Sequence, residues 1–174
     1  MFEYKKIAVI GCCGAGKSVF SRKLASVTGL PLYHLDIMYW REDCTHIDRT
    51  DFMEKQNDVI NTEKWIIDGN YRNTLENRIK AAELIFFFDL PTEICLSGAL
   101  TRGERADMPC ILPPNDEIKE FIVNYNKTTK PIVLDLFNKY SDKKVIIFHS
   151  HKAADDFIMR LADICKTYEV NNND

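Results

Sequence analysis

The sequence predicts an α/β protein built around a parallel sheet, and three observations support this prediction. Short apolar runs recur along the chain without the alternation that is typical of half-exposed strands. Stretches with apolar residues at helical spacing separate these runs. The first run, residues 7–10, leads directly into the glycine-rich segment of residues 11–18, GCCGAGKS, and a helical stretch follows at residues 19–27. Strand, glycine loop and helix therefore stand in the order of a phosphate-binding unit.

Residues 11–18, the phosphate loop, fit the pattern G-x-x-x-x-G-K-[ST] completely, which weighs against a chance match on a glycine-rich turn. The loop must turn its amide N–H groups inward around an anion, and Gly11, Gly14 and Gly16 permit the necessary dihedral angles. Lys17 supplies a charge for the β- and γ-phosphates, and the Ser18 hydroxyl can ligate Mg²⁺. The sequence thus predicts an ATP and Mg²⁺ site. Its residues are Gly11, Cys12, Cys13, Gly14, Ala15, Gly16, Lys17 and Ser18.

The elements around the phosphate loop follow from the same patterns. Residues 4–10 are expected to form the central strand, because their apolar residues run together and the loop follows them directly. The helix after the loop should end at Thr28, since Gly29 can adopt the left-handed conformation of a helix C-cap and Pro31 prevents continuation. Residues 32–35 then form a short strand.

Asp36 follows that strand at its carboxyl end, the edge of an open α/β sheet where ligands bind. It is therefore a candidate catalytic residue, which would hold a water on Mg²⁺ or accept the proton of an attacking substrate oxygen. The alternative is that Asp36 caps the next helical turn. Tyr39 and Trp40 beside it offer either a flat surface for a substrate base or a cap on the core.

A second candidate carboxylate, Asp68, ends the apolar strand of residues 64–68. It has the place of a Walker B acid, which holds Mg²⁺ from the side opposite Ser18. Asp-Gly is also a hairpin signal, but residues 74–80 after it have helical spacing, which favours the metal-binding interpretation. The preceding residues, 41–61, are expected to be a polar loop and a helix on the substrate side.

The second half of the chain predicts a strand at residues 84–88, a helix at residues 91–100 and then a lid at residues 102–115, where glycine and prolines interrupt helical order. Arg102 and Arg105 in this lid are candidates to neutralise the developing charge of a transferred phosphoryl group. The alternative is a solvated turn in which they pair with nearby carboxylates.

Three more elements complete the expected fold. Residues 116–140 should be helical with a break at Pro131, residues 145–148 should form the last strand, and residues 153–168 should form a closing helix.

Composition narrows the class of protein. With 174 residues the chain suits one domain, residues 1–174, and its net charge of −3 gives no general attraction to DNA or to an anionic membrane. The longest apolar run is strand-sized, so we expect no membrane segment and a cytoplasmic location. The six cysteines lack paired spacing and are expected to be reduced. Cys12 and Cys13 are either oxidisable thiols beside cationic groups or small, tolerated side chains.

The order of these motifs resembles a known family. GCCGAGKS, HLDIMYW at residues 34–40, IIDGNY at residues 66–71 and FDLP at residues 88–91 are similar to the DNA topology modulation proteins, a branch of the adenylate-kinase-like phosphate-loop kinases. The resemblance implies a three-layer fold in which helices cover both faces of a five-stranded parallel sheet of order 2-3-1-4-5, with a short lid. It also implies that Arg72, in a D-G-x-x-R segment, grips the phosphate of the acceptor, and that Asp36 lies near the acceptor.

The sequence therefore predicts an ATP-dependent, Mg²⁺-requiring phosphotransferase that acts on a nucleoside monophosphate or another small-molecule acceptor. The alternative is a nucleotide-dependent regulatory or DNA-associated module that transfers no phosphate, although the acidic net charge counts against it. A small ATPase or GTPase switch is less favoured, because the chain has no guanine-reading N-K-x-D string.

Overall fold

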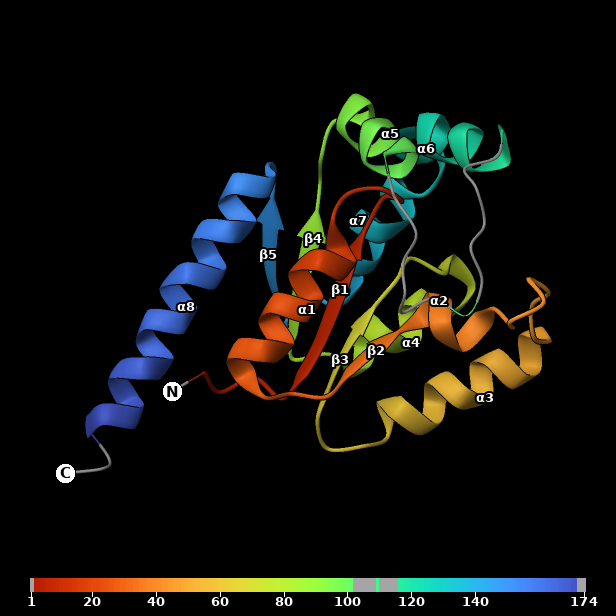
Figure 1. The fold of residues 1–174 in the computed structure, drawn as a ribbon. Coiled ribbons are helices and arrows are strands. Elements are labelled where there is room, and N and C mark those ends of the chain that lie inside the picture. Colours follow the sequence, from red (N-terminus) through yellow and green to blue (C-terminus); the bar gives the residue numbers. More distant parts are fainter. Residues whose placement is uncertain (1, 102–108, 110–115, 172–174) are drawn as a thin grey trace.

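A five-stranded parallel sheet of order β2-β3-β1-β4-β5 forms the centre of the molecule (Figure 1). The computed structural model describes residues 2–101, 109 and 116–171. The strands are β1 (Lys6–Gly11), β2 (Leu32–His34), β3 (Trp65–Asp68), β4 (Leu84–Phe88) and β5 (Lys144–Phe148). All four neighbouring pairs are parallel, so the predicted fold class and strand order are confirmed.

Helices cover both faces of this sheet. They are α1 (Lys17–Thr28), α2 (Leu35–Tyr39), α3 (Arg49–Ile60), the 3₁₀ helix η1 (Arg72–Thr74), α4 (Leu75–Ala81), α5 (Thr92–Leu100), α6 (Asp116–Thr128), α7 (Lys130–Lys139) and α8 (His151–Asn171). Residues of α1, α5, α6 and α8 share one buried cluster, and residues of α2, α3, α4 and α7 share the other.

The central strand shows why one sheet supports two cores. Ile7 and Val9 of β1 belong to the first cluster, whereas Ala8 and Ile10 belong to the second, because successive side chains of a strand point to opposite faces. All four side chains are fully buried. A strand with two buried faces needs a continuous apolar run, which is the pattern that the sequence shows.

The phosphate loop packs unusually closely against α5. A Cβ atom at Gly14 would overlap the carbonyl oxygen of Cys95 and lie 2.7 Å from the Ala99 nitrogen. In the reverse direction, a Cβ atom at Gly98 would overlap the carbonyl oxygen of Gly14. Each backbone therefore occupies the space that a side chain would take on the other, and Gly98 belongs to this packing although it lies outside the phosphate-loop motif.

The structure corrects several predicted boundaries. Leu35 begins α2 and does not end a strand, so His34 is the N-cap of that helix and Asp36 lies in its first turn. The capping role considered for Asp36 is therefore wrong. The helix predicted over residues 116–140 is divided at Thr129, since Pro131 occupies the first turn of a new helix, α7, where its missing N–H costs nothing.

The structure also tests the prediction that the cysteines are reduced. Cys12, Cys13, Cys95 and Cys165 are free thiols, but Cys44 is engaged in a disulfide, so the expectation of reduced thiols throughout is wrong. Spacing along the chain could not indicate this, because disulfide formation depends on which residues meet in the fold.

Within the described ranges, no helix combines the length and the apolar character needed to cross a bilayer.

Candidate active site

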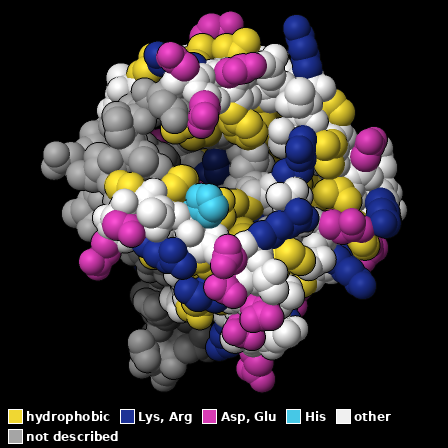
Figure 2. Space-filling model, turned by 90° about the vertical axis from the view of Figure 1, so that its right-hand side faces the viewer, with side chains coloured by type: hydrophobic (Ala, Val, Ile, Leu, Met, Phe, Trp, Pro, Cys, Tyr) yellow, Lys and Arg dark blue, Asp and Glu magenta, His cyan; other side chains and the backbone are white. Residues whose placement is uncertain are grey.

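A cavity of about 200 Å³ opens at the carboxyl ends of β1 and β3. The phosphate loop and the start of α1 form one side of the cavity, which we call the phosphate wall. It consists of Cys13, Lys17 and Ser18. The opposite lining is the acceptor wall, which consists of Asp36, Asp68, Gly69, Asn70 and Tyr71. Figure 2 shows a hollow on the corresponding side of the molecule with a basic side chain at its bottom.

The phosphate wall presents backbone donors and one cation. Gly16 is the N-cap of α1 with a left-handed φ of 86°, and no side chain in the described part of the chain caps this helix end. The first N–H groups of α1 are thus available to an anion, which the positive end of the helix dipole also favours. Lys17 follows directly, and its Nζ donates a hydrogen bond to the Cys12 carbonyl at 2.7 Å. The Lys17 side chain therefore folds back along the phosphate loop.

The two loop cysteines have different surroundings. Cys13 lines the cavity, whereas Cys12 is only 3% exposed and faces the core beside Cys95. The hydrogen bond with Cys95, together with burial, raises the pKa of the Cys12 thiol. Burial in apolar surroundings makes a thiol unreactive. For Cys12, the structure favours the interpretation as a small side chain that packs.

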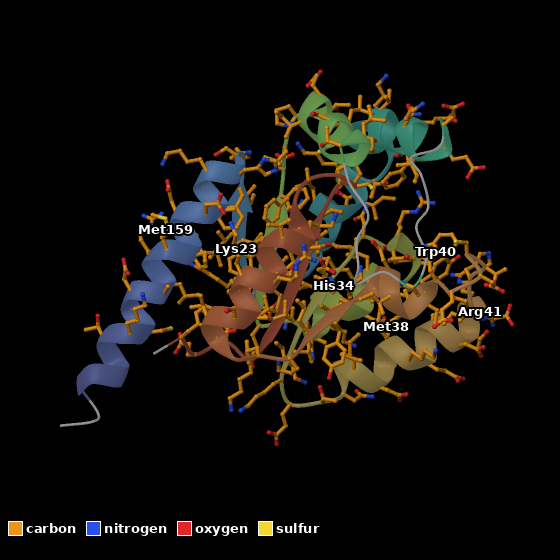
Figure 3. All side chains as sticks on the ribbon, viewed as in Figure 1. Lys23, His34, Met38, Trp40, Arg41 and Met159 are labelled. Atoms are coloured by element: carbon orange, nitrogen blue, oxygen red, sulfur yellow. The ribbon has the colours of Figure 1, made fainter. Side chains whose placement is uncertain are left out.

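Asp68 ends β3 as a buried carboxylate, and its two oxygens have different surroundings. Its Oδ1 accepts a hydrogen bond from His34 Nδ1 at 2.7 Å, and both side chains are buried. Its Oδ2 has no hydrogen-bond partner among the described residues. Figure 3 shows His34 close to the middle of the molecule, whereas Trp40 and Arg41 lie toward its right-hand side. His34 therefore fixes the orientation of Asp68 and leaves one oxygen for a ligand.

Asp36 is oriented by Tyr71. The Tyr71 hydroxyl donates a hydrogen bond to Asp36 Oδ1 at 3.0 Å, which joins the start of α2 to the segment after β3. Burial raises the pKa of the Tyr71 hydroxyl, and the negative charge of Asp36 raises this pKa further. The hydroxyl therefore stays protonated at neutral pH and keeps donating to the carboxylate. The ring of Tyr39 packs in this aromatic group against the ring of Tyr71 at a tilt of 56°, with 5.0 Å between the ring centroids, which supports its role as a cap on the core.

A buried arginine supports the acceptor wall from behind. Arg78 of α4 is fully buried, and its Nη1 donates to Gln56 Oε1 and to Thr74 Oγ1, both at 2.7 Å. Its Nη2 donates to the carbonyl oxygens of Gly69 at 3.2 Å and of Asn70 at 3.4 Å. Burial lowers the pKa of Arg78 to about 9, so the guanidinium remains charged at neutral pH. Its fork therefore holds two consecutive carbonyl groups of the acceptor wall.

The predicted site residues are brought together only in part. Lys17, Ser18, Asp36, Asp68 and Cys13 line one cavity, and the other phosphate-loop residues form the backbone beside it. Arg72 is exposed at the start of η1 and is not among the described lining residues. Arg102 and Arg105, with nearly all of the predicted lid, lie outside the described residues.

Besides Gly69, four residues of the site carried no separate prediction. Asn70 and Tyr71 stood only within the IIDGNY string, and His34 only within the HLDIMYW string. Nothing in the sequence singled out Arg78, because an arginine within a helix is ordinarily solvent-exposed. The strings HLDIMYW and IIDGNY, which are particular to the resemblance, therefore contain more of the residues that line the cavity than the general phosphate-loop pattern does.

Comparison with known proteins supports the fold. No family model matches the sequence. An adenylate kinase from Prochlorococcus marinus (strain MIT 9301) is 31% identical over 88 residues, which is 45% of this chain and 45% of that protein. The match thus spans less than half of the curated relative.

Two solved structures resemble nearly the whole chain. The shikimate kinase from Acinetobacter baumannii in complex with shikimate has a TM-score of 0.63 at 15% identity and covers 95% of each chain. A gluconokinase from Sinorhizobium meliloti 1021 has a TM-score of 0.57 at 12% identity and covers 96% of this chain and 97% of that one. At such identities these likenesses show a shared fold.

Proposed function

We propose that this chain is an ATP-dependent, Mg²⁺-requiring phosphotransferase that acts on a small acceptor. The observation that carries the proposal is the cavity itself, which has Lys17 and Ser18 on one wall and Asp36 and Asp68 on the other. Phosphoryl transfer needs a cation on the phosphates, oxygen ligands for a metal ion and a carboxylate beside the attacking group. All three are present in one space.

The residues fit Mg²⁺. The Oδ2 of buried Asp68, which has no partner among the residues that the structure describes, and the hydroxyl of Ser18 are hard oxygen ligands. Mg²⁺ is commonly held by one or two such groups together with water and substrate phosphates. When bound, the ion would neutralise charge on the β- and γ-phosphates. In this proposal Ser18 and Asp68 hold the metal, the loop amides and Lys17 hold the phosphates, and His34 keeps Asp68 in position.

Asp36 is proposed to act on the acceptor. An acceptor oxygen forms a bond to the γ-phosphorus as the bond from that phosphorus to the β-phosphate oxygen breaks, and ADP leaves. Where the attacking oxygen belongs to a hydroxyl group, its proton passes to Asp36, whose orientation Tyr71 fixes through the 3.0 Å hydrogen bond. Asn70 Oδ1 is buried and has no partner among the described residues, so it can accept a hydrogen bond from the acceptor.

The acceptor is proposed to be a nucleoside monophosphate or another small molecule. The D-G-x-x-R segment supports the first class, with Arg72 on the acceptor phosphate, and the partial likeness to an adenylate kinase agrees with it. The shikimate-bound structural neighbour makes small hydroxylated acids the next class to examine. Arg102 and Arg105 are proposed to neutralise the transferred group.

A panel of acceptors tests the proposal. Nucleoside monophosphates, nucleosides, shikimate and gluconate are incubated with ATP and Mg²⁺, and phosphorylated products are measured by mass spectrometry. At least one acceptor should be phosphorylated at a rate that the Lys17→Met variant lacks. If ATP binds but no acceptor is phosphorylated above basal hydrolysis, the chain is better described as a nucleotide-dependent regulatory module. A DNA affinity that falls steeply with salt would then support that alternative.

A further inference from the structure

The phosphate loop has an outer side that faces the start of α8. His151 is the first residue of this helix, and its Nε2 lies 3.2 Å from the Ala15 carbonyl oxygen. A Cβ atom built at Gly16 would lie 3.1 Å from His151 Nε2 and 3.3 Å from its Cδ2. The imidazole therefore lies against the peptide that joins Ala15 to Gly16. His151 is not among the described residues that line the cavity.

The hydrogen bond fixes the direction of that peptide. A carbonyl oxygen only accepts, so His151 Nε2 carries the hydrogen and donates it to Ala15. The described peptide bonds contain no cis bond, and in a trans peptide the C=O and N–H groups point in opposite directions. With the Ala15 carbonyl directed at His151, the Gly16 N–H therefore points away from the histidine.

This peptide needs an external support, because its own residues restrain it little. Gly16 has a φ of 86°, a conformation open to glycine, and glycine populates both signs of φ about equally. Rotation of the peptide would turn the Gly16 N–H away from the phosphates and the carbonyl toward them. A carbonyl oxygen directed at a phosphate replaces an attraction with a repulsion, so the hydrogen bond from His151 selects the binding conformation.

Helix α8 is well placed to give this support. Ala154, Ile158 and Leu161 of α8 are buried in the same cluster as Phe20 of α1. Lys23 of α1 also pairs with Asp155 of α8 at 2.7 Å, and Figure 3 shows Lys23 between the two helices. Because α1 begins directly after Gly16, the helix that carries His151 is fixed relative to the loop that it contacts.

We propose that His151 is a positioning residue for nucleotide binding, which holds the Ala15–Gly16 peptide with the Gly16 N–H directed at the phosphates. The inference rests on the proposed function only in that the phosphate loop binds a nucleotide, and it requires no particular acceptor. It assigns the last helix of the chain a part in a site formed by the first loop.

The test measures the dissociation constant of Mg²⁺–ATP by calorimetry, so it does not depend on turnover. His151→Leu removes the donor and should weaken binding about fivefold, as expected for one hydrogen bond. His151→Gln places an amide donor near the position of Nε2 and should restore affinity. The matched control is His149→Leu, since His149 lies two residues earlier but contacts the Asp89 carbonyl at 3.3 Å instead of the loop.

A second measurement reads the peptide directly. In ¹⁵N–¹H spectra without nucleotide, the Gly16 amide signal should shift in His151→Leu and return toward the wild-type position in His151→Gln, while the melting temperature stays unchanged. Unaltered affinity in His151→Leu, or an equal loss in His149→Leu, overturns the proposal. Wild-type protein that binds ATP but phosphorylates nothing refutes the transferase and leaves this inference standing, whereas wild-type protein that binds no ATP refutes both.

Discussion

The phosphate wall and the acceptor wall face each other across one cavity, but they are held in shape by different means. The phosphate wall depends on its own backbone, with glycines at left-handed φ, on the close packing of Gly14 against α5 and on a contact from the exposed His151. The acceptor wall depends on the fully buried Arg78, which donates to four oxygen atoms of four residues.

The difference teaches where each wall is vulnerable. A wall made of backbone donors loses function when its charge or peptide orientation changes, and the core behind it remains intact. A wall supported by a buried cation loses stability when the cation is removed, because its partners are then left unpaired. Four substitutions examine this contrast, and we give them from the largest expected effect to the smallest.

Lys17→Met should have the largest effect, a loss of turnover of about 10³-fold with little change in stability, because it removes one charge that is directed at the phosphates. The measurement is the rate of phosphoryl transfer at saturating acceptor. The matched control is Lys23→Met on the same helix, since Lys23 pairs with Asp155 away from the cavity. Comparable losses in both variants would contradict a specific role of Lys17.

Arg78→Met should lower the free energy of unfolding by about 3 kcal/mol, since four oxygen atoms lose a donor inside the protein. Urea denaturation measures this change. Arg78→Lys should recover only part of it, because an ammonium group cannot reproduce the fork. Arg160→Met on the surface of α8 serves as the control and should change stability by less than about 0.5 kcal/mol. Full stability in Arg78→Met would show that the acceptor wall needs no such support.

Gly98→Ala should destabilise the protein by about 2 kcal/mol, because the new methyl group would overlap the Gly14 carbonyl and displace the phosphate loop or α5. A loss of stability would be informative, since at an ordinary helix position alanine stabilises the helix by about 1 kcal/mol relative to glycine. Thermal and urea unfolding measure the change, with the exposed Ser97→Ala as the control. A gain in stability would mean that the loop and helix are less closely packed than described.

His34→Gln should have the smallest effect, an increase of about tenfold in the Mg²⁺ concentration needed for half-maximal activity, because Asp68 loses the donor that orients it. His34→Asn can place an amide donor near the position of Nδ1 and should lie closer to the wild type. Affinity for ATP without metal should not change in either variant. Equal metal dependence in His34→Gln and the wild type would remove His34 from the site.

The sequence predicted the phosphate wall better than the acceptor wall, and the reason is physical. A backbone nest requires glycines at fixed spacing, and that requirement is written directly in residues 11–18. Asp36 and Asp68 could be placed at one edge because both follow strands of a parallel sheet. The boundary between β2 and α2 was missed, since a three-residue strand and a five-residue helix leave little periodicity to detect.

The supporting residues could not be predicted from local patterns. The burial of Arg78 depends on Gln56 from α3 and on Thr74 from η1, which approach it only in the folded chain. The contact of His151 with Ala15 joins the last helix to the first loop. Sequence periodicity reports which side of an element is buried, but it does not report which distant element covers that side.

The mutual fit of Gly14 and Gly98 has a consequence for protein engineering. A phosphate-binding loop is often treated as a portable unit. Here, however, the loop at Gly14 packs into the space that the missing side chain of Gly98 leaves open on α5. A shift of that helix by one residue, which combines a translation of about 1.5 Å with a rotation of about 100°, would bring a methyl or hydroxymethyl group into the space that Gly98 leaves open. Any chimera that transplants this loop must therefore carry the matching helix with it.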